Sequence, residues 1–286
     1  MTILNKLATT LASVVLATGA AQAATVPLNE WYFNPVGQGF ASSQYVYEYL
    51  DVNGSGFFEV NRTGGTAVAV REHAAFIVPQ ADSNGHLFPV DYPGGTITGI
   101  YEATGVGELG GAFRYTGGSL RFYQNPVNMQ FGTTEGIYGA NLGKLVGSVR
   151  ILDGSGELDA SGNPVPNTQK MILAQAARGD LASGYFFDAS GRDLADAANL
   201  QFVLPMAYTE TNGWPEMVAE IACEFAGFTG PGCGGGNYGN VSGEHYLLGI
   251  NGQLKLAEVP EPGSLALFGL ALCAATAAGR RRRAVH

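Results

Sequence analysis

The sequence predicts a mainly all-β protein, an antiparallel β-sandwich or jelly-roll-like domain with one or two short helices. Short segments in which apolar and polar residues alternate recur along the chain, as at residues 119–124 and 145–152. Glycine occurs 42 times in 286 residues, about twice its usual share of roughly 7%, which suits a chain with many tight turns. A signal helix and a C-terminal hydrophobic helix are expected outside this domain.

Alternation and turn residues predict the strands in order. They are expected at residues 44–50, 57–60, 67–78, 96–102, 109–115, 119–124, 145–152, 201–208 and 245–258. The pair Asn53-Gly54 is expected to turn a hairpin between the first two. The pattern Gly-Val-Gly-Glu-Leu-Gly at 105–110 matches the letters of a dinucleotide fingerprint, but strands precede and follow it, so a glycine-rich connection is expected instead.

One helix is predicted at residues 215–226. It begins with Pro215 and stops at Gly227, and its apolar residues are spaced by four at Met217, Ile221 and Phe225. A further turn or two of helix is expected at residues 193–200.

The first 24 residues read as a secretory signal peptide. Lys6 precedes an apolar stretch at 7–17, and Ala21 and Ala23 give the small-residue cleavage pattern. The chain is therefore expected to leave the cytoplasm through the Sec export machinery.

The other end carries a three-part tail. Pro260, Glu261 and Pro262 precede a short apolar run at 263–279, and the arginines that follow are Arg280, Arg281, Arg282 and Arg283. Since a permanent span wants roughly 20 apolar residues, this run just crosses a thin membrane. The arginines would stay in the cytoplasm, which leaves the domain on the periplasmic side during a transient inner-membrane insertion.

This tail resembles the PEP-CTERM sorting signal of exported bacterial proteins. The resemblance implies that a membrane-embedded exosortase removes the tail and passes the protein to the cell surface or the extracellular polysaccharide matrix. The expected organisation is a signal peptide at 1–24, a glycine-rich β-sandwich domain at 25–258, and the sorting signal at 259–283.

The charge balance excludes one class of partner. The chain has 15 Lys and Arg against 24 Asp and Glu, for a net charge of −9, and several of its cations lie in the two terminal segments. Nucleic acid is therefore not an expected partner, since phosphate would be repelled.

Two cysteines of the domain are expected to pair. Cys223 and Cys233 are ten positions apart in a chain bound for an oxidising compartment, which favours a disulfide. Free or metal-binding thiols are the alternative.

Two oxygen-rich segments are candidates for calcium, the only cofactor that the sequence suggests. They contain Asp51 and Asn53 in one segment, and Asp153 and Asp159 in the other. An EF-hand loop that began at Asp51 would need Glu at its twelfth position, where Arg62 stands. Ordinary turns are the alternative, and a looser site built from several loops stays open.

Signs of catalysis are few, and a non-catalytic protein is expected. There is no GxSxG elbow and no HExxH motif. Glu72 and His73 are adjacent on a predicted strand and would point to opposite faces. A secreted glycan hydrolase remains the enzymatic alternative, because carboxylates far apart in the sequence can meet in space.

Aromatic side chains offer either core packing or a flat surface for sugar rings. Those in question are Trp31, Tyr32 and Phe33 near the mature N-terminus, and Tyr45, Tyr47 and Tyr49 on one face of a predicted strand.

A second resemblance concerns residues 117–132, 143–158 and 183–196. The last of these reads SGYFFDASGRDLAD, and the three are similar to segments of flocculation-associated PEP-CTERM proteins. The resemblance implies a surface or matrix protein associated with exopolysaccharide and with cell aggregation in flocs or biofilms. A calcium-assisted carbohydrate-binding module is a further alternative.

Overall fold

The computed structural model describes residues 26–84, 86–89, 95–126, 130–166, 168 and 170–259. Residues Pro27–Ala257 form one compact unit. The predicted signal peptide and the sorting tail from Pro260 onward lie outside the described residues, so their expected helices are not tested.

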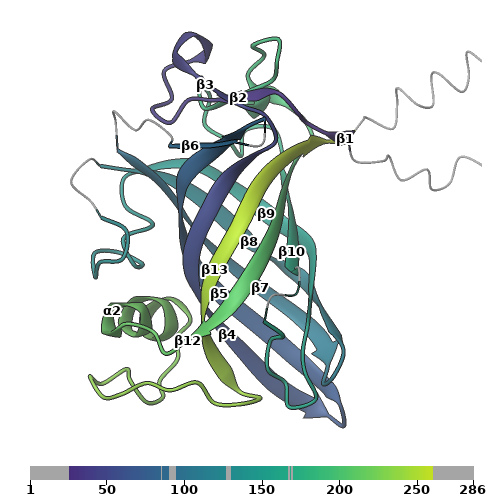
Figure 1. The fold of residues 1–286 in the computed structure, drawn as a ribbon, viewed down its shortest axis with the longest axis vertical. Helices are drawn as coiled ribbons and strands as arrows, with labels where there is room; N and C mark the ends of the chain where they lie inside the picture. The colour runs from purple at the N-terminus through teal and green to yellow at the C-terminus, as the bar shows by residue number, and fades with distance from the viewer. Residues whose placement is uncertain are drawn as a thin grey trace, which may run out of the picture. The chain divides into compact units, whose positions relative to one another are not determined.

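The domain is a closed antiparallel barrel of eight strands (Figure 1). Around the barrel the strands are β4 (Tyr49–Gly64), β5 (Ala67–Ser83), β7 (Thr96–Glu108), β8 (Ala112–Asn125), β9 (Lys144–Glu157), β10 (Lys170–Ala176), β12 (Leu200–Thr211) and β13 (His245–Glu258). The sheet closes because β13 pairs with β4 from His245 opposite Glu59 to Lys255 opposite Tyr49.

The all-β prediction is confirmed, but the sandwich or jelly-roll is wrong. Both architectures present one dry face and one wetter face, so alternation along a strand is the same in each. What separates them is the pairing of the first long strand with the last, which no local pattern reveals. The strands are also longer than predicted: residues 109–115 and 119–124 do not form two strands, because residues 112–125 run as the single strand β8.

The expected hairpin at Asn53-Gly54 is also wrong, since both residues lie inside β4. The pairing register of β4 with β5 shifts between Asp51 and Asn53, which marks a bulge. A Cβ on Gly54 would stand 2.4 Å from the carbonyl oxygen of Ala75. The glycine therefore allows two strands to approach closely at a bulge. In the sequence alone, such a glycine looks the same as one in a turn.

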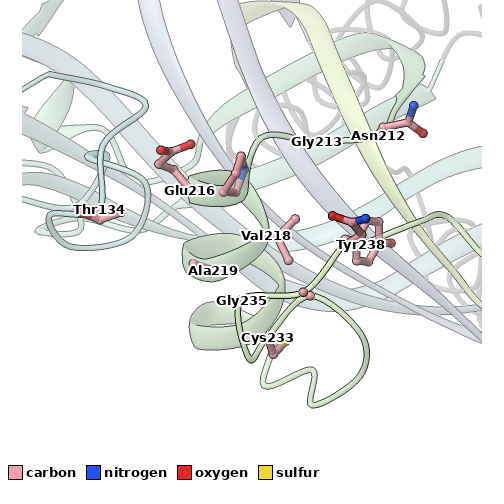
Figure 2. A pocket seen from close by; sticks show the side chains of 13 residues that line it. Thr134, Asn212, Gly213, Glu216, Val218, Ala219, Cys233, Gly235 and Tyr238 are labelled. Carbon is pink, nitrogen blue, oxygen red and sulfur yellow. The ribbon is translucent and has the colours of Figure 1, made fainter.

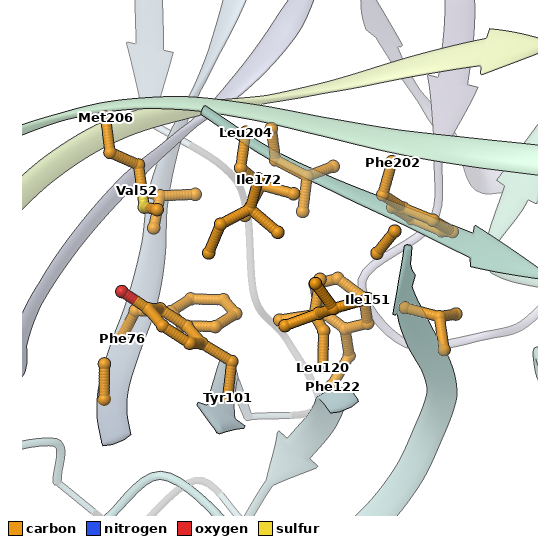
Figure 3. Close-up of a cluster of buried hydrophobic side chains, with 14 of the residues drawn as sticks. Val52, Phe76, Tyr101, Leu120, Phe122, Ile151, Ile172, Phe202, Leu204 and Met206 are labelled. Atoms are coloured by element: carbon orange, nitrogen blue, oxygen red, sulfur yellow. The ribbon is translucent and has the colours of Figure 1, made fainter. Parts of the chain in front are cut away.

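The inward-facing side chains fill the barrel (Figure 3). Phe122 contacts Phe76 and Phe202 at ring-centroid distances of 5.9 and 5.3 Å. Apolar residues from opposite walls, such as Ile172 of β10 and Phe76 of β5, are buried in the same cluster. The interior is thus a packed core.

A helical segment covers part of the outer wall, as predicted for residues 215–226. It consists of α2 (Pro215–Met217) and the π-helix η3 (Val218–Phe225). Its apolar face packs on the outer face of the barrel in a second cluster that includes Phe57, Ile100 and Leu247. Phe57 faces outward under the helix and Phe58 faces inward, so this part of β4 is buried on both faces.

A small three-stranded sheet lies at one end of the barrel, at the top of Figure 1. It orders β11 (Phe186–Phe187), β2 (Trp31–Phe33) and β3 (Gln44–Val46). The remaining elements are β1 (Val26–Pro27), β6 (His86–Pro89) and the 3-10 turns η1 (Phe40–Ser42) and η2 (Leu194–Asp196). The turn η2 takes the place of the helix expected at 193–200.

Candidate functional site

The outer face of the small sheet presents a group of aromatic rings. Tyr32 of β2 lies opposite Tyr45 of β3 in the pairing register, and their ring centroids are 5.6 Å apart. Phe40 lies 5.0 Å from the ring of Tyr32. We call Tyr32, Phe40 and Tyr45 the aromatic surface. Phe40 and Tyr45 are 40% and 37% exposed, which is unusual for large apolar rings and leaves them open to a ligand.

The alternation of β2 produces this arrangement. Trp31 and Phe33 point toward the barrel and are fully buried, whereas Tyr32 between them points outward. Phe33 and Trp31 pack on Phe186 of β11. The aromatic run at 31–33 therefore gives Trp31 and Phe33 to the core and leaves Tyr32 on the outer side. The predicted use of these rings as a surface for sugars stays a prediction.

The loop that carries Phe40 is held in place by a buried asparagine. The amide nitrogen of Asn34 donates to the carbonyl of Gly39 at 2.6 Å and to Ser42 Oγ at 2.9 Å. Its amide oxygen accepts from the backbone N–H of Val36 at 3.0 Å. Because all of these bonds lie within the loop, Phe40 is held in position before any ligand arrives.

The segment Phe187–Asp193 supports Phe40 from the other side. Phe187 lies 5.6 Å from the ring of Phe40. Asp188 accepts hydrogen bonds from Ser190 and Arg192; burial would raise the pKa of this carboxyl, but these bonds outweigh it and lower the pKa to about 2. The carboxylate is therefore committed to its own turn. Sequence reasoning did not assign Phe40 or Phe187 to a site, because Phe40 has no aromatic neighbour in the sequence and no strand was predicted at Phe187.

Residues 44–50 do not form one strand, so the expectation that Tyr45, Tyr47 and Tyr49 share one face of a strand is wrong. The chain leaves β3 after Val46 and enters the barrel at Tyr49. Tyr49 instead receives the ammonium group of Lys255, 5.4 Å from its ring centroid.

The candidate calcium ligands are not brought together. Asp51 and Asn53 lie on β4, and Asp153 lies on β9, which is four strands away in either direction around the barrel. Asp159 accepts hydrogen bonds from Ser161 and from both nitrogens of Asn163 in its own loop. Within the described ranges no three His, Cys, Asp or Glu side chains gather in a way that holds a metal ion.

Glu72 and His73 point to opposite faces of β5. Glu72 lies inside the barrel and pairs with Lys170. Three tyrosine hydroxyls also donate to its carboxylate, those of Tyr101, Tyr115 and Tyr208. His73 lies on the outer face, where its ring contacts Phe225 of the helix at 4.9 Å. The two side chains therefore cannot act as a catalytic pair.

Cys223 and Cys233 form the expected disulfide, with their Cα atoms 5.6 Å apart. It joins the helix η3 to the glycine-rich loop that follows.

Among known proteins, a family model for the PEP-CTERM protein-sorting motif matches residues 258–283. No curated protein and no solved structure matches the chain. In the part of the chain that the structure describes, no helix has both the length and the apolar character to cross a membrane.

The match defines the class of the protein. It is an exported protein that is sorted to the cell surface, and its tail marks it for processing by exosortase. More particularly, it is a PEP-CTERM sorting-signal protein whose domain is an eight-stranded barrel. The similarity to flocculation-associated proteins stays a prediction.

Proposed function

We propose that the mature protein is a non-catalytic component of the cell surface or extracellular matrix that binds exopolysaccharide through the aromatic surface and so promotes cell aggregation. The observation that carries the proposal is the exposure of Tyr45 on the small sheet and of Phe40 on the adjacent turn η1. Aromatic rings present flat apolar faces, and the tyrosines add polar edges, a combination suited to the C–H faces and hydroxyl groups of sugars.

Charge narrows the ligand to uncharged or weakly charged glycans. The chain carries a net charge of −9, so a strongly anionic polymer would be repelled. The structural alternative is that the rings of the aromatic surface only stabilise the small sheet. The buried side chains of Trp31, Phe33 and Phe186 already stabilise it.

The proposal assigns no reaction to the domain. Its most enclosed carboxylate, Glu72, is held by Lys170 and three tyrosines. Asp188 accepts a hydrogen bond from Arg192 in its own turn, and Asp193 accepts one from the backbone N–H of Gly184. Incubation with the polysaccharide is expected to leave the number of reducing ends unchanged, and their release would contradict a non-catalytic role.

The test is calorimetric titration with exopolysaccharide purified from the producing strain. Tyr45→Ala and Phe40→Ala are each expected to weaken binding about tenfold, or about 1.4 kcal/mol. Val106→Ala on β7 is the matched control, since Val106 is also an exposed apolar residue. Binding is expected to persist in EDTA, because no metal is invoked. Equal affinities for the wild type and both ring variants would overturn the proposal.

For delivery we propose Sec-type export followed by transient insertion of residues 263–279 into the inner membrane. Deletion from Pro260 onward is expected to leave the protein in the periplasm. Mature protein outside the cells that still ends at His286 would contradict removal of the tail.

A further inference from the structure

A pocket of about 530 Å³ lies beside the disulfide, between the helix and the glycine-rich loop after it (Figure 2). Its lining includes Asn212, Glu216, Asn237 and Tyr238. The volume is within the range of pockets that hold small ligands. The pocket shares no lining residue with the aromatic surface.

The polar groups of this pocket are available to a ligand. Asn212 and Asn237 are exposed, and among the described residues neither side-chain amide has a hydrogen-bond partner in the protein. Three lining residues, Gly232, Gly235 and Gly236, are glycines, so no side chain covers the backbone there. Amide groups that both donate and accept, next to a carboxylate acceptor on Glu216, complement the hydroxyl groups of a sugar.

An exposed aromatic side chain, that of Trp214, lies between two residues that line the pocket. Trp214 is 70% exposed, the most exposed large apolar side chain of those described. Its neighbours Gly213 and Pro215 both line the pocket. Tryptophan combines a broad apolar face with one N–H donor, which suits Trp214 to contact a sugar ring at the edge of the pocket.

The walls of the pocket are fixed. The Cys223–Cys233 disulfide joins the helix to the loop. Asn240 holds the far side, because its amide nitrogen donates to the carbonyl of Thr211 at 3.1 Å and its amide oxygen accepts from the N–H of Leu247 at 2.8 Å. Little ordering is therefore needed when a ligand binds.

We propose that this pocket is a second carbohydrate-binding site, for an uncharged sugar unit. Glu216 and the acidic chain disfavour a uronate or a sulfated sugar. The wall of the pocket packs on Leu247 near the start of β13. Near the other end of β13, the carbonyl of Leu256 accepts from the N–H of Leu28, which lies three residues before β2 of the small sheet. Leu247 and Leu256 are about 30 Å apart along β13 at about 3.3 Å per strand residue, so the two sites lie toward opposite ends of the barrel (Figure 1).

Two sites at this separation make each chain able to bridge two polysaccharide strands. Bridging rests on the proposed function of the aromatic surface, whereas the inference that the pocket binds a sugar does not rest on it. A bivalent chain gains avidity on one polymer and cross-links two.

The experiment uses the natural tryptophans as reporters, because the chain has only two. Trp31 is buried and Trp214 is exposed. Neutral oligosaccharides released from the exopolysaccharide are expected to shield Trp214 from acrylamide, so that quenching falls toward that of a buried indole. Asn237→Ala is expected to weaken this protection about tenfold. Met171→Ala, on β10 and away from the pocket, is the matched exposed control.

A second measurement separates the two sites. Beads coated with the polysaccharide are expected to clump with the wild type, but not with Trp214→Ala or with the Phe40→Ala/Tyr45→Ala double variant. If no oligosaccharide protects Trp214 while binding still depends on Tyr45, the pocket inference fails and the proposed function stands. If Trp214 is protected but the Phe40 and Tyr45 variants bind and clump as the wild type does, the pocket stands and the aromatic surface does not.

Discussion

Lys170 and Glu72 form an ion pair inside the barrel, although they are 98 positions apart in the sequence. Both side chains are almost fully buried. The ammonium group of Lys170 also lies 4.2 Å from the ring centroid of Tyr208 and 4.8 Å from that of Tyr115. Burial lowers the pKa of Lys170 to about 8, although Glu72 favours the charged form. The pair joins β5 to β10 across the barrel, so it can form only when the barrel is closed.

Removal of one partner is expected to destabilise the barrel strongly. Lys170→Met leaves the carboxylate of Glu72 buried without a cation, which costs about 3–5 kcal/mol in the free energy of unfolding. Lys255→Met is the control, because Lys255 is partly exposed and bonds Glu48 at 3.3 Å; a loss of at most about 1 kcal/mol is expected there. Urea unfolding of both variants is the measurement, and equal losses would show that the buried pair has no special role.

The sequence predicts the inward and outward alternation of this barrel but not its closure. Glu72 was expected to point away from His73, and it does. Its partner could not be predicted, because nothing near Lys170 in the sequence indicates that β10 faces β5. The pair Asn53-Gly54 predicts a hairpin that does not form, for the same reason: the residue that Gly54 must accommodate, Ala75, comes from another strand.

Stability is expected to fall as the pH drops below about 6.5, partly through His73. Burial lowers the pKa of His73, as does the nearby Arg71, while Glu102 and Glu72 act in the opposite direction. The unfolded chain therefore binds a proton at a pH where the folded chain does not, so acid favours unfolding. Nδ1 of His73 is buried and lacks a hydrogen-bond partner among the described residues.

His73→Gln removes this titration, so the variant is expected to lose less stability than the wild type between pH 7 and pH 5. Chemical unfolding at the two pH values measures the difference. His86→Gln is the control, because His86 is exposed on β6. A pH dependence in His73→Gln as steep as in the wild type would rule out this histidine as the cause.

Gly99→Ala is expected to cost about 1–3 kcal/mol, the usual range for an overpacked core. A Cβ at this position would stand 2.2 Å from the ring of Phe76 and 2.7 Å from the carbonyl oxygen of Arg121. Gly117→Ala on β8 is the matched variant, since no atom lies within 4 Å of its added Cβ. Thermal unfolding is the measurement, and a loss for Gly117→Ala as large as that for Gly99→Ala would refute the packing argument.

The candidate site was predicted in part. The aromatic residues at 31–33 and Tyr45 were identified from the sequence, and the period of a strand correctly separates Tyr32 from Trp31. Phe40 was missed because a 3-10 turn and the hydrogen bonds of Asn34 place it, and neither leaves a recognisable spacing. The pocket beside Trp214 was missed because loop residues far apart in the sequence line it.

The disulfide is expected to stabilise the outer layer more than the barrel. On the chain-entropy model, closure of a loop of this length contributes roughly 3 kcal/mol. In Cys223→Ala/Cys233→Ala, amide hydrogen exchange is expected to rise across residues 228–240, which lose their covalent tie to η3. Amides of β7 and β8 should keep their protection, because the main core cluster does not include either cysteine.

Unchanged exchange at 228–240 would mean that packing of Phe228 and Tyr238 on Phe57 alone holds the loop. If exchange is unchanged, oligosaccharides should still shield Trp214 from acrylamide in this variant. If the loop is loosened, that shielding should be lost.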